Sequence, residues 1–441
     1  MKRAIFSVLV ISFALLLKSC NTTEPPPPPP NGDKPTLELT LEDVSCIETW
    51  IKLKTTNLQL PATITLKQIN PTGDSLSQYF ILNTQDTLLY VDSLLPNKTY
   101  QYQVSSIEHQ VSSNELSVTT MDTTSHDFIF ETFTFGGTAG SSTLYDVAII
   151  NEDNIWAVGE ILVADTSQNG YTMYNAVHWN GSDWKLKRIM FYTICGQPHQ
   201  NAYAASSIFA FSVNDIWVAM LGSQIARLND TTQIATQCIP ISVRKLWGSD
   251  NQNIYAVGVN GKIAYYNGTL WTRIESGTEI SIIDVFGVVN QTNNQHKVFC
   301  AVSDIINNPG QYKILTISEN NYIDSLHWNL DRSTASTWSN NGWIVYASGG
   351  GVFNNKTRSW EEERSIPLYY TNRIRGNGLN DIFVVGDFAL LAQFNGKKWN
   401  VYQELLQLPL TSFNSITVNE NIIAIVGYNG EKALIIIGRR L

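Results

Sequence analysis

The charged residues best placed to do chemistry occupy one equivalent position in four copies of a repeated strand pattern. They are Asp146, Lys245, Asp284 and Arg373. Two carboxylates that face one space can divide the roles of general acid and general base, provided that their pKa values are separated. Asp146 and Asp284 are candidates for those roles by position alone. Two anions and two cations can equally bind a small polar ligand or pair with one another.

The pattern that carries these residues is a short phrase that returns seven times between residue 150 and the C-terminus. Its clear copies begin at Asn154, Asn214, Asn253, Asn380 and Asn421, and weaker copies begin near Lys297 and Trp343. The first step spans 60 residues and the others about 40 to 45. A period of this length made of short strands is typical of a β-propeller with one blade per repeat. We therefore expect an all-β fold with a seven-bladed propeller over residues 127–441.

Inner strands line the central channel of a propeller, so the equivalent charged positions are expected to form a ring there. Trp247, Phe286 and Arg375 follow two residues after the ring position. The candidate ligand-binding residues are thus Asp146, Lys245, Asp284, Arg373, Arg375 and Trp247. The alternative is a water-filled channel whose charges satisfy one another. Exposed ion pairs contribute about 0–1 kcal/mol, so losing one charge there should cost little stability.

The last repeat lacks an outer strand. It supplies the segments Phe413–Val418, Ile422–Tyr428 and Ala433–Gly438. We expect Phe128–Phe135, which precedes the first blade, to pair beside the last segment. Such closure ties the two ends of the ring together and leaves no unpaired edge.

Residues 35–122 read as short alternating strands, which predicts a β-sandwich. The stretch Leu94–Tyr100 resembles the tyrosine-corner region of fibronectin type III domains, and Ser113–Thr120 resembles their last strand. Trp50 occupies the position of a core tryptophan on an early strand. The resemblance implies a fibronectin type III-like module in which Trp50 and Tyr100 have structural roles.

Residues 1–19 read as a signal peptide, with Lys2 and Arg3 followed by the apolar run Ala4–Leu17. The ending Leu17–Cys20 resembles the lipobox of bacterial lipoproteins, which implies lipidation of Cys20. An ordinary signal peptide beside an unrelated cysteine is the alternative. Residues 20–34 form a linker whose six prolines make a stiff spacer of roughly 19 Å. A proline-rich ligand for another domain is the rival interpretation of that run.

Turns of the form Asn-Gly-x-x-Trp return at Asn180, Asn267 and Asn395. With the repeated phrase they resemble BNR-like and photosystem-assembly-factor-like propellers of bacteria. Lipoproteins with a signal, a fibronectin-like module and such a propeller are familiar from Bacteroidota- and Ignavibacteria-type bacteria. The resemblance is architectural and implies no substrate. We expect the tryptophans of these turns to pack within and between blades, and stacking on carbohydrate is the alternative.

Charge and ligand chemistry exclude several functions. The formal net charge is -9 and no basic run occurs, which argues against nucleic-acid binding. The six histidines are scattered without ligand spacing, so no metal and no cofactor are expected. The oxygen-rich loop Asp165–Gly170 lacks the acidic residue that a hand-type calcium loop requires.

Four cysteines remain if Cys20 carries lipid. They are Cys46, Cys195, Cys238 and Cys300. Cys195 and Cys238 flank the second repeat and could pair, although connectivity cannot be read from a sequence. Buried thiols are equally compatible with the spacing.

These observations predict a monomeric, outer-membrane-anchored lipoprotein of the bacterial cell envelope, either periplasmic or exposed on the surface. The expected function is binding or scaffolding, in which the propeller presents a rigid surface to a protein or glycan partner. The alternative is a glycan-active hydrolase or lyase with its site at the channel mouth.

Overall fold

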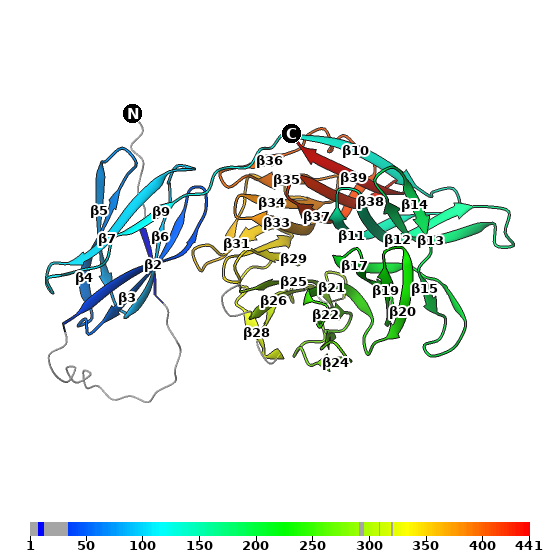
Figure 1. Cartoon of the computed structure of the whole chain (residues 1–441), viewed down its shortest axis with the longest axis horizontal. Coiled ribbons are helices and arrows are strands. Elements are labelled where there is room, and N and C mark those ends of the chain that lie inside the picture. The colour runs from blue at the N-terminus through cyan, green and yellow to red at the C-terminus, as the bar shows by residue number, and fades with distance from the viewer. Residues whose placement is uncertain (1–7, 13–33, 291–294, 308, 319–320) are drawn as a thin grey trace. The chain divides into compact units, whose positions relative to one another are not determined.

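The computed structural model describes residues 8–12, 34–290, 295–307, 309–318 and 321–441, without the side chains of 8–12. Its regular elements are β-strands, as the cartoon of the chain shows (Figure 1). No helix among these residues has the length and apolarity needed to cross a membrane. The chain divides into two compact units, residues 1–124 with 395–398 and residues 125–394 with 399–441.

The first unit holds two antiparallel sheets. One has the order β1-β6-β3-β2, and its strands are β1 (Val8–Ser12), β2 (Thr36–Val44), β3 (Thr49–Thr56) and β6 (Asp86–Val91). The other has the order β5-β4-β7-β8, with β9 also paired to β7. Its strands are β4 (Ala62–Ile69), β5 (Ser75–Leu82), β7 (Thr99–Ser106), β8 (Val111–Ser112) and β9 (Leu116–Thr119). Alternate residues such as Ile64 and Leu66 are buried, which is how a strand with one apolar face forms half of a sandwich core.

Tyr100 is buried, and its hydroxyl accepts a hydrogen bond of 2.8 Å from the Leu95 backbone N–H. This is the contact expected of a tyrosine corner. Trp50 is also fully buried, at 5.5 Å between its ring centroid and that of Tyr90. However, strand alternation places Trp50 on the face of β3 opposite to Ile51 and Leu53, which belong to the sandwich core. The expectation of a structural role fits this burial, but the side chain lies outside that core cluster.

Part of the apolar run expected to be a signal peptide pairs with the sandwich. Val8–Ser12 forms β1, which runs antiparallel to β6 from Val8 beside Val91 to Ser12 beside Thr87. Cys20 and the proline run lie outside the described residues, as does most of the predicted leader.

The second unit contains seven four-stranded antiparallel sheets, counted over its described residues. The first three are β11 (Thr143–Asn151), β12 (Asn154–Ala164), β13 (Tyr171–Trp179), β14 (Trp184–Lys187); β17 (Ala205–Ser212), β18 (Asp215–Met220), β19 (Gln224–Asn229), β20 (Thr232–Cys238); and β21 (Val243–Asp250), β22 (Asn253–Gly258), β23 (Ile263–Tyr266), β24 (Trp271–Ile274). The next two are β25 (Ile282–Val289), β26 (His296–Val302), β27 (Lys313–Ile317), β28 (Ile323–Leu326); and β29 (Thr334–Ser339), β30 (Val345–Gly349), β31 (Gly351–Asn354), β32 (Glu361–Glu362). The last two are β33 (Thr371–Gly378), β34 (Asp381–Gly386), β35 (Leu391–Phe394), β36 (Trp399–Val401); and β37 (Thr411–Asn419), β38 (Ile422–Asn429), β39 (Lys432–Arg440), β10 (Phe128–Phe135).

The first strands of these sheets form a closed ring. Each of β11, β17, β21, β25, β29, β33 and β37 contacts the next, and β37 contacts β11 (Figure 1). Sheets arranged radially around their inner strands define a β-propeller. The prediction of an all-β propeller is therefore confirmed.

The predicted closure is also confirmed. β10 pairs antiparallel with β39 along its whole length, from Phe128 beside Arg440 to Phe135 beside Ala433. Phe128 and Phe130 pack against the hydrophobic cluster of the last two sheets, and Phe133 and Phe135 pack against the cluster shared with the first. A segment from before the first sheet thus completes the last one.

The repeated phrase has a physical explanation in the second strand of each sheet. Its apolar residues are buried between neighbouring sheets, and several copies end in glycine beside the start of the inner strand. A Cβ at Gly159 would collide with the Thr143 carbonyl oxygen, and one at Gly258 would collide with that of Ser242. Glycine therefore ends the phrase because the two backbones approach too closely for a side chain.

The first two copies of the repeat are 60 residues apart because a hairpin is inserted between the first two sheets. Its strands are β15 (Met190–Tyr192) and β16 (Gln200–Ala202). Cys195 in its turn forms a disulfide with Cys238 at the end of β20, which selects one of the pairings that the sequence left open. Cys46 and Cys300 are buried.

Candidate functional site

A β-bulge recurs near the start of every inner strand. In each case the register shifts at one unpaired residue: Tyr145, Ser206, Arg244, Ile283, Ala335, Asn372 or Asn414. Bulges bend a strand and re-aim the neighbouring side chains. The residue that follows each bulge makes contact with its counterparts on other inner strands, as the hydrogen bonds described next show.

We call these seven following residues the polar layer. They are Asp146, Ser207, Lys245, Asp284, Ser336, Arg373 and Ser415, one from each inner strand. Sequence comparison of the repeats identified the four charged members. The three serines were missed, although they stand at the same offset, because serine alone predicts no site.

Asp146 is the centre of one half of the polar layer. Its Oδ1 accepts hydrogen bonds from Lys245 Nζ at 2.5 Å and from Ser415 Oγ at 2.9 Å. Its Oδ2 accepts from Ser207 Oγ at 2.7 Å and from the Ile208 backbone N–H at 2.9 Å. Both carboxylate oxygens are therefore fully engaged.

Asp284 is the centre of the other half. It pairs with Arg373 and accepts two hydrogen bonds from Arg375, one of 2.8 Å to Oδ1 and one of 3.0 Å to Oδ2. Ser336 Oγ and the Thr337 backbone N–H also donate to Oδ2. A guanidinium that reaches both oxygens of one carboxylate makes a strong and directional pair.

The charges pair with one another, as the alternative interpretation expected, but the expectation that they are exposed to water is wrong. Asp146 is 1 % exposed, Asp284 0 %, Lys245 7 % and Arg373 8 %. The bulges and the serines bring the charges within hydrogen-bond distance, so the charged groups are buried against one another. Removing one member of such a buried pair leaves its partner uncompensated, which is strongly destabilising.

The pKa values follow from this burial and pairing. Burial alone would raise the pKa of Asp146, but Lys245, Arg373 and the hydrogen bonds hold it below its usual range. Burial opposes ionisation of Asp284 as well, and Arg373 and Arg375 keep its pKa well below the ordinary value. Burial lowers the pKa of Lys245 to about 8, against the opposing influence of Asp146.

The lowered pKa values of the two carboxyl groups argue against the hydrolase alternative. A glycosidase needs one carboxyl group whose raised pKa lets it donate a proton near neutral pH. Both Asp146 and Asp284 have lowered pKa values and carboxylate oxygens already occupied by hydrogen-bond donors. Neither is suited to be the general acid, and the alternative loses the two residues on which it depended.

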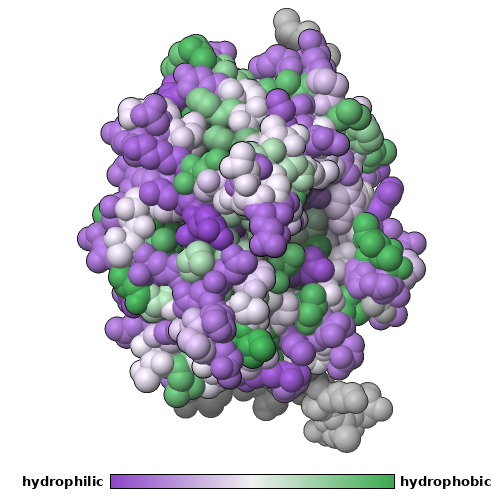
Figure 2. Space-filling model, turned by 90° about the vertical axis from the view of Figure 1, so that its right-hand side faces the viewer, coloured by the Kyte–Doolittle hydropathy of each residue, from purple (hydrophilic) through white to green (hydrophobic). Residues whose placement is uncertain are grey.

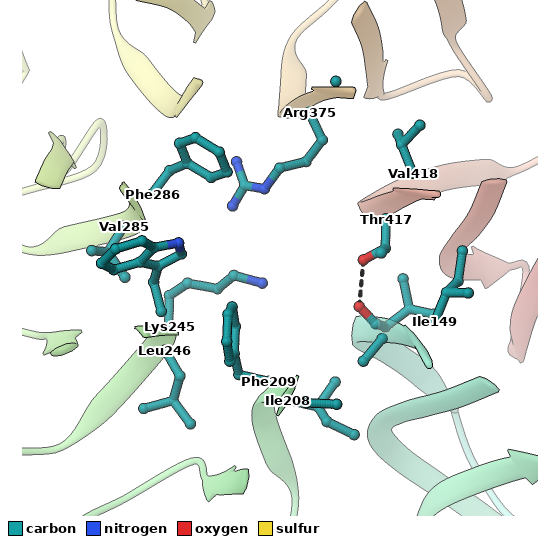
Figure 3. Close-up of a pocket in the computed structure, with 15 residues that line it drawn as sticks. Ile149, Ile208, Phe209, Lys245, Leu246, Val285, Phe286, Arg375, Thr417 and Val418 are labelled. Carbon is teal, nitrogen blue, oxygen red and sulfur yellow. Dashed lines mark hydrogen bonds between the residues drawn. The ribbon is translucent and has the colours of Figure 1, made fainter. Parts of the chain in front are cut away.

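Cavities lie on both sides of the polar layer. The cavity of about 480 Å³ is lined by residues of the bulges, including Tyr145, Arg244 and Asn372. The cavity of about 260 Å³, which we call the aromatic cavity, is lined by residues that follow the polar layer (Figure 3). Three of its wall residues are Phe209, Trp247 and Phe286. Lys245 of the polar layer and Arg375, two residues after Arg373, also reach it (Figure 3).

The predicted residues are thus divided between two environments. Asp146 pairs with Lys245, and Asp284 pairs with Arg373 and Arg375. Trp247 stands in the wall of the aromatic cavity instead of among the charges. Phe209 belongs to the same wall and was missed, although it stands two residues after Ser207 just as Trp247 follows Lys245.

The tryptophans of the Asn-Gly-x-x-Trp turns pack as expected. The ring centroids of Trp184 and Trp179 are 5.5 Å apart, those of Trp271 and Tyr266 are 5.2 Å apart, and those of Trp399 and Phe394 are 5.4 Å apart. Their aromatic surface is used within the sheets.

Metal ligation finds no support in the described part of the chain, where no group of three or more His, Cys, Asp or Glu residues could hold an ion. In the oxygen-rich loop, Asp165 Oδ1 accepts a hydrogen bond of 2.9 Å from the Ser167 backbone N–H, and Oδ2 accepts from Thr172. That carboxylate stabilises a turn.

Comparison with known proteins gives structures of similar fold. No family model matches the chain, and no curated protein matches its sequence. The Dos1 propeller is 11% identical with a TM-score of 0.45 and covers 69% of this chain and 94% of its own. BamB from Moraxella catarrhalis is 9% identical with a TM-score of 0.41 and covers 70% and 98%. A quinonprotein alcohol dehydrogenase-like protein from Bacteroides thetaiotaomicron is 9% identical with a TM-score of 0.34 and covers 90% and 94%. Likenesses at this level carry no argument about ligand or activity.

Proposed function

We propose that this chain is a lipid-anchored envelope protein whose seven-bladed propeller binds a protein partner through one face of the ring. In an antiparallel four-stranded sheet, successive loops lie at alternate ends. The loops that lead into each inner strand therefore share an end with the loops between the second and third strands. We call this end the entry face.

The observation that carries the proposal is the distribution of exposed apolar side chains. Loops and strand ends at the entry face expose Tyr171, Leu221, Ile305, Ile306, Leu368, Tyr369, Phe388, Leu410 and Tyr428. At the loops and strand ends of the opposite face, the described residues of this kind are fewer, namely Ile129, Leu270, Tyr322 and Leu441. Elsewhere hydrophilic residues surround small separate groups of hydrophobic ones, as on the side shown in Figure 2. Apolar side chains gathered on one face mark an interaction surface.

The last two sheets supply the most developed part of this surface. Phe388 is 66 % exposed and Leu410 is 81 % exposed, and they line a cavity of about 680 Å³ together with Leu408, Pro409 and Tyr428. The ring centroids of Phe388 and Tyr369 are 5.0 Å apart. The cavity therefore presents apolar walls at the protein surface.

The backbone adopts an energetically unfavourable conformation where it exposes these side chains. Phe388 has φ of 58°, Ala389 has 55° and Leu410 has 50°, all in the left-handed region that residues with bulky side chains seldom adopt. The Ala389 backbone N–H donates to the Thr411 carbonyl at 3.0 Å, which helps to fix the conformation. Strained residues tend to occur where function needs a particular presentation. Leucine and isoleucine are prominent on this face, and such aliphatic groups favour a protein partner over a glycan.

Envelope location rests on several observations. The predicted leader 1–19, Cys20 and linker 20–34 support export and lipid anchoring. The exposed disulfide Cys195–Cys238 is typical of an oxidising compartment. Cleavage of the leader would remove β1 from the edge of β6. We also propose that the chain is a monomer.

The sandwich of the first unit is proposed to be fibronectin type III-like. Its strand order, β2-β3-β6 in one sheet and β5-β4-β7-β9 in the other, supports this proposal. The hydrogen bond between Tyr100 and Leu95 supports the same assignment. Its role here is to connect the anchor to the propeller.

Site-specific photo-crosslinking in the native host tests the proposed surface. A photoreactive residue placed at position 388 or 410 should give one discrete protein adduct, identifiable by mass spectrometry. Matched probes at Leu270 and Tyr322 on the opposite face should not give it, and Tyr369→Glu should weaken adduct formation at position 388. Equal adducts from both faces, or a glycan adduct in place of protein, would contradict the proposal.

A further inference from the structure

The aromatic cavity carries positive charge without a matching number of carboxylates. The cationic groups are Lys245 and Arg373 of the polar layer and Arg375, two residues further along β33, whereas the carboxylates are Asp146 and Asp284. The remaining inner strands contribute only the uncharged Ser207, Ser336 and Ser415 to the layer. No carboxylate lines the aromatic cavity among its described residues. The polar layer together with Arg375 thus has one cation in excess, and a buried charge is costly unless it is compensated.

The Arg375 guanidinium donates to Asp284, Ser336 and two backbone carbonyls, whereas Lys245 has a single acceptor among the described residues. Lys245 Nζ donates to Asp146 Oδ1, and an ammonium group has three N–H donors in all. Figure 3 shows the Lys245 amino group and the Arg375 guanidinium extending into the open space between the inner strands. An anion placed between Lys245 and Arg375 would accept hydrogen bonds from the Lys245 ammonium and would lie beside the Arg375 charge.

The residues that line the aromatic cavity indicate which chemical group the anionic ligand should carry. The half-buried Phe209 and Phe286 present aromatic surface beside Trp247, which is 7 % exposed, and the Arg375 guanidinium lies 5.2 Å from the centroid of the Phe286 ring. Flat apolar groups stack well on such walls. The charge excess is one, so a monoanion balances it and a phosphate dianion would not.

We propose that the aromatic cavity binds an aromatic monocarboxylate, with its carboxylate between Lys245 and Arg375 and its ring against Trp247 and Phe286. The carboxylate can belong to a free acid or to the C-terminal aromatic residue of a peptide. This site lies on the opposite side of the polar layer from the bulge residues, so it is independent of the entry face.

Isothermal titration of the full chain in low-chloride buffer tests the proposal. Indole-3-acetate represents the free acid, and a short peptide ending in tryptophan represents the second source. We expect saturable binding of at least one, with a Kd below about 1 mM. The neutral analogues, indole-3-acetamide and the amidated peptide, should bind at least tenfold more weakly. Equal affinity for acid and amide, or no binding of any probe, would overturn the proposal.

Two variants and a control locate the site. Ala148→Phe fills the cavity without touching the polar layer and should reduce affinity at least tenfold while the protein stays folded. Arg375→Met should do the same through loss of charge, and Asp284 would keep Arg373 as its partner. Arg244→Met removes an exposed cation on the other side of the layer and should change nothing. Retained affinity in Ala148→Phe, or loss in Arg244→Met, would place binding elsewhere and refute the assignment.

The pH dependence gives an independent readout. The groups that face Lys245 are Asp146, Asp284, Arg373 and Arg375, and its pKa in the free protein is about 8. Affinity for the carboxylate should be constant between pH 6 and about 7, then fall by up to tenfold per pH unit above 8 as the ammonium deprotonates. An affinity independent of pH up to 10 would show that Lys245 does not contact the ligand.

Discussion

Lys245 Nζ on β21 lies 2.5 Å from Asp146 Oδ1 on β11, and both side chains are buried. The two strands belong to the third and first sheets and contact each other only through the centre of the ring. Asp284 on β25 and Arg373 on β33 repeat the relationship two sheets apart. The polar layer is therefore a structural cross-connection of the propeller as well as the floor of the aromatic cavity.

Breaking an ion pair of the polar layer should lower the free energy of unfolding. Asp146→Asn leaves the Lys245 ammonium buried without its counter-ion, and loss of one partner of a buried pair costs about 3–5 kcal/mol. Urea unfolding measures the change in free energy. The control is Glu131→Gln, because Glu131 pairs with Arg439 on the surface, where the expected cost is about 0–1 kcal/mol. Similar losses for both variants would show that burial of the layer does not govern its contribution.

Stability should fall in acid because of Asp146 and Asp284. Their folded-state pKa values lie below those of the unfolded chain, so the unfolded state takes up protons first as pH falls. The stabilisation is fully present above the unfolded value of about 4 and is lost progressively below it. Chemical unfolding at pH 6, 4 and 3 measures the slope. Asp284→Asn should be less stable at pH 6 and should have a shallower slope; an unchanged slope would contradict the assignment.

The closing strand should be essential to the last sheet. A chain that lacks residues 1–136 loses β10 and exposes the edge of β39, whereas one that lacks residues 1–124 keeps both strands. Removing even one buried phenylalanine costs about 3–5 kcal/mol, and β10 carries four that are half-buried. We expect the shorter chain to unfold at least about 5 °C lower by calorimetry. Coincident melting of the two truncations would refute this role.

The disulfide should secure the inserted hairpin. Replacing both Cys195 and Cys238 by serine opens a loop of 43 residues and should cost about 2–4 kcal/mol. Limited proteolysis should then cut between Met190 and Ala202, the bounds of the hairpin. Reductant should make the native protein equally sensitive and leave the double variant unchanged. Resistance of the double variant would show that packing alone holds the hairpin.

Membrane attachment should depend on Cys20. In the native host, Cys20→Ala should move the protein from the membrane fraction to the soluble fraction, because the acyl chains contribute about 0.8 kcal/mol for each buried methylene. Mass spectrometry of the native N-terminus should show lipid on Cys20. Cys300→Ala serves as the control for loss of a thiol elsewhere. Unchanged fractionation together with an unmodified N-terminus would contradict the anchor.

The spacing of the repeats predicted the propeller, its closing strand and the four charged residues of the polar layer. Strand periodicity and equivalent positions within repeats are visible in a sequence. Burial of those charges was not predictable. It depends on the bulges at residues such as Tyr145, which break the simple alternation, and on Ser207, Ser336 and Ser415, whose type is too common to signal a site. The 60-residue first step was visible, but only coordinates could assign it to an inserted hairpin and pair Cys195 with Cys238.

The pairing of β10 with β39 also sets an order of events in biogenesis. β10 is made before any of the seven inner strands, yet its partner is the last strand in the chain. Until residues 433–440 have been synthesised, β10 has no edge to join, and the ring stays open. A nascent or prematurely terminated chain therefore displays an unpaired strand rich in phenylalanine, which is the kind of segment that chaperones and envelope proteases recognise. Ring closure thus works as a check that all seven sheets of the propeller have been made.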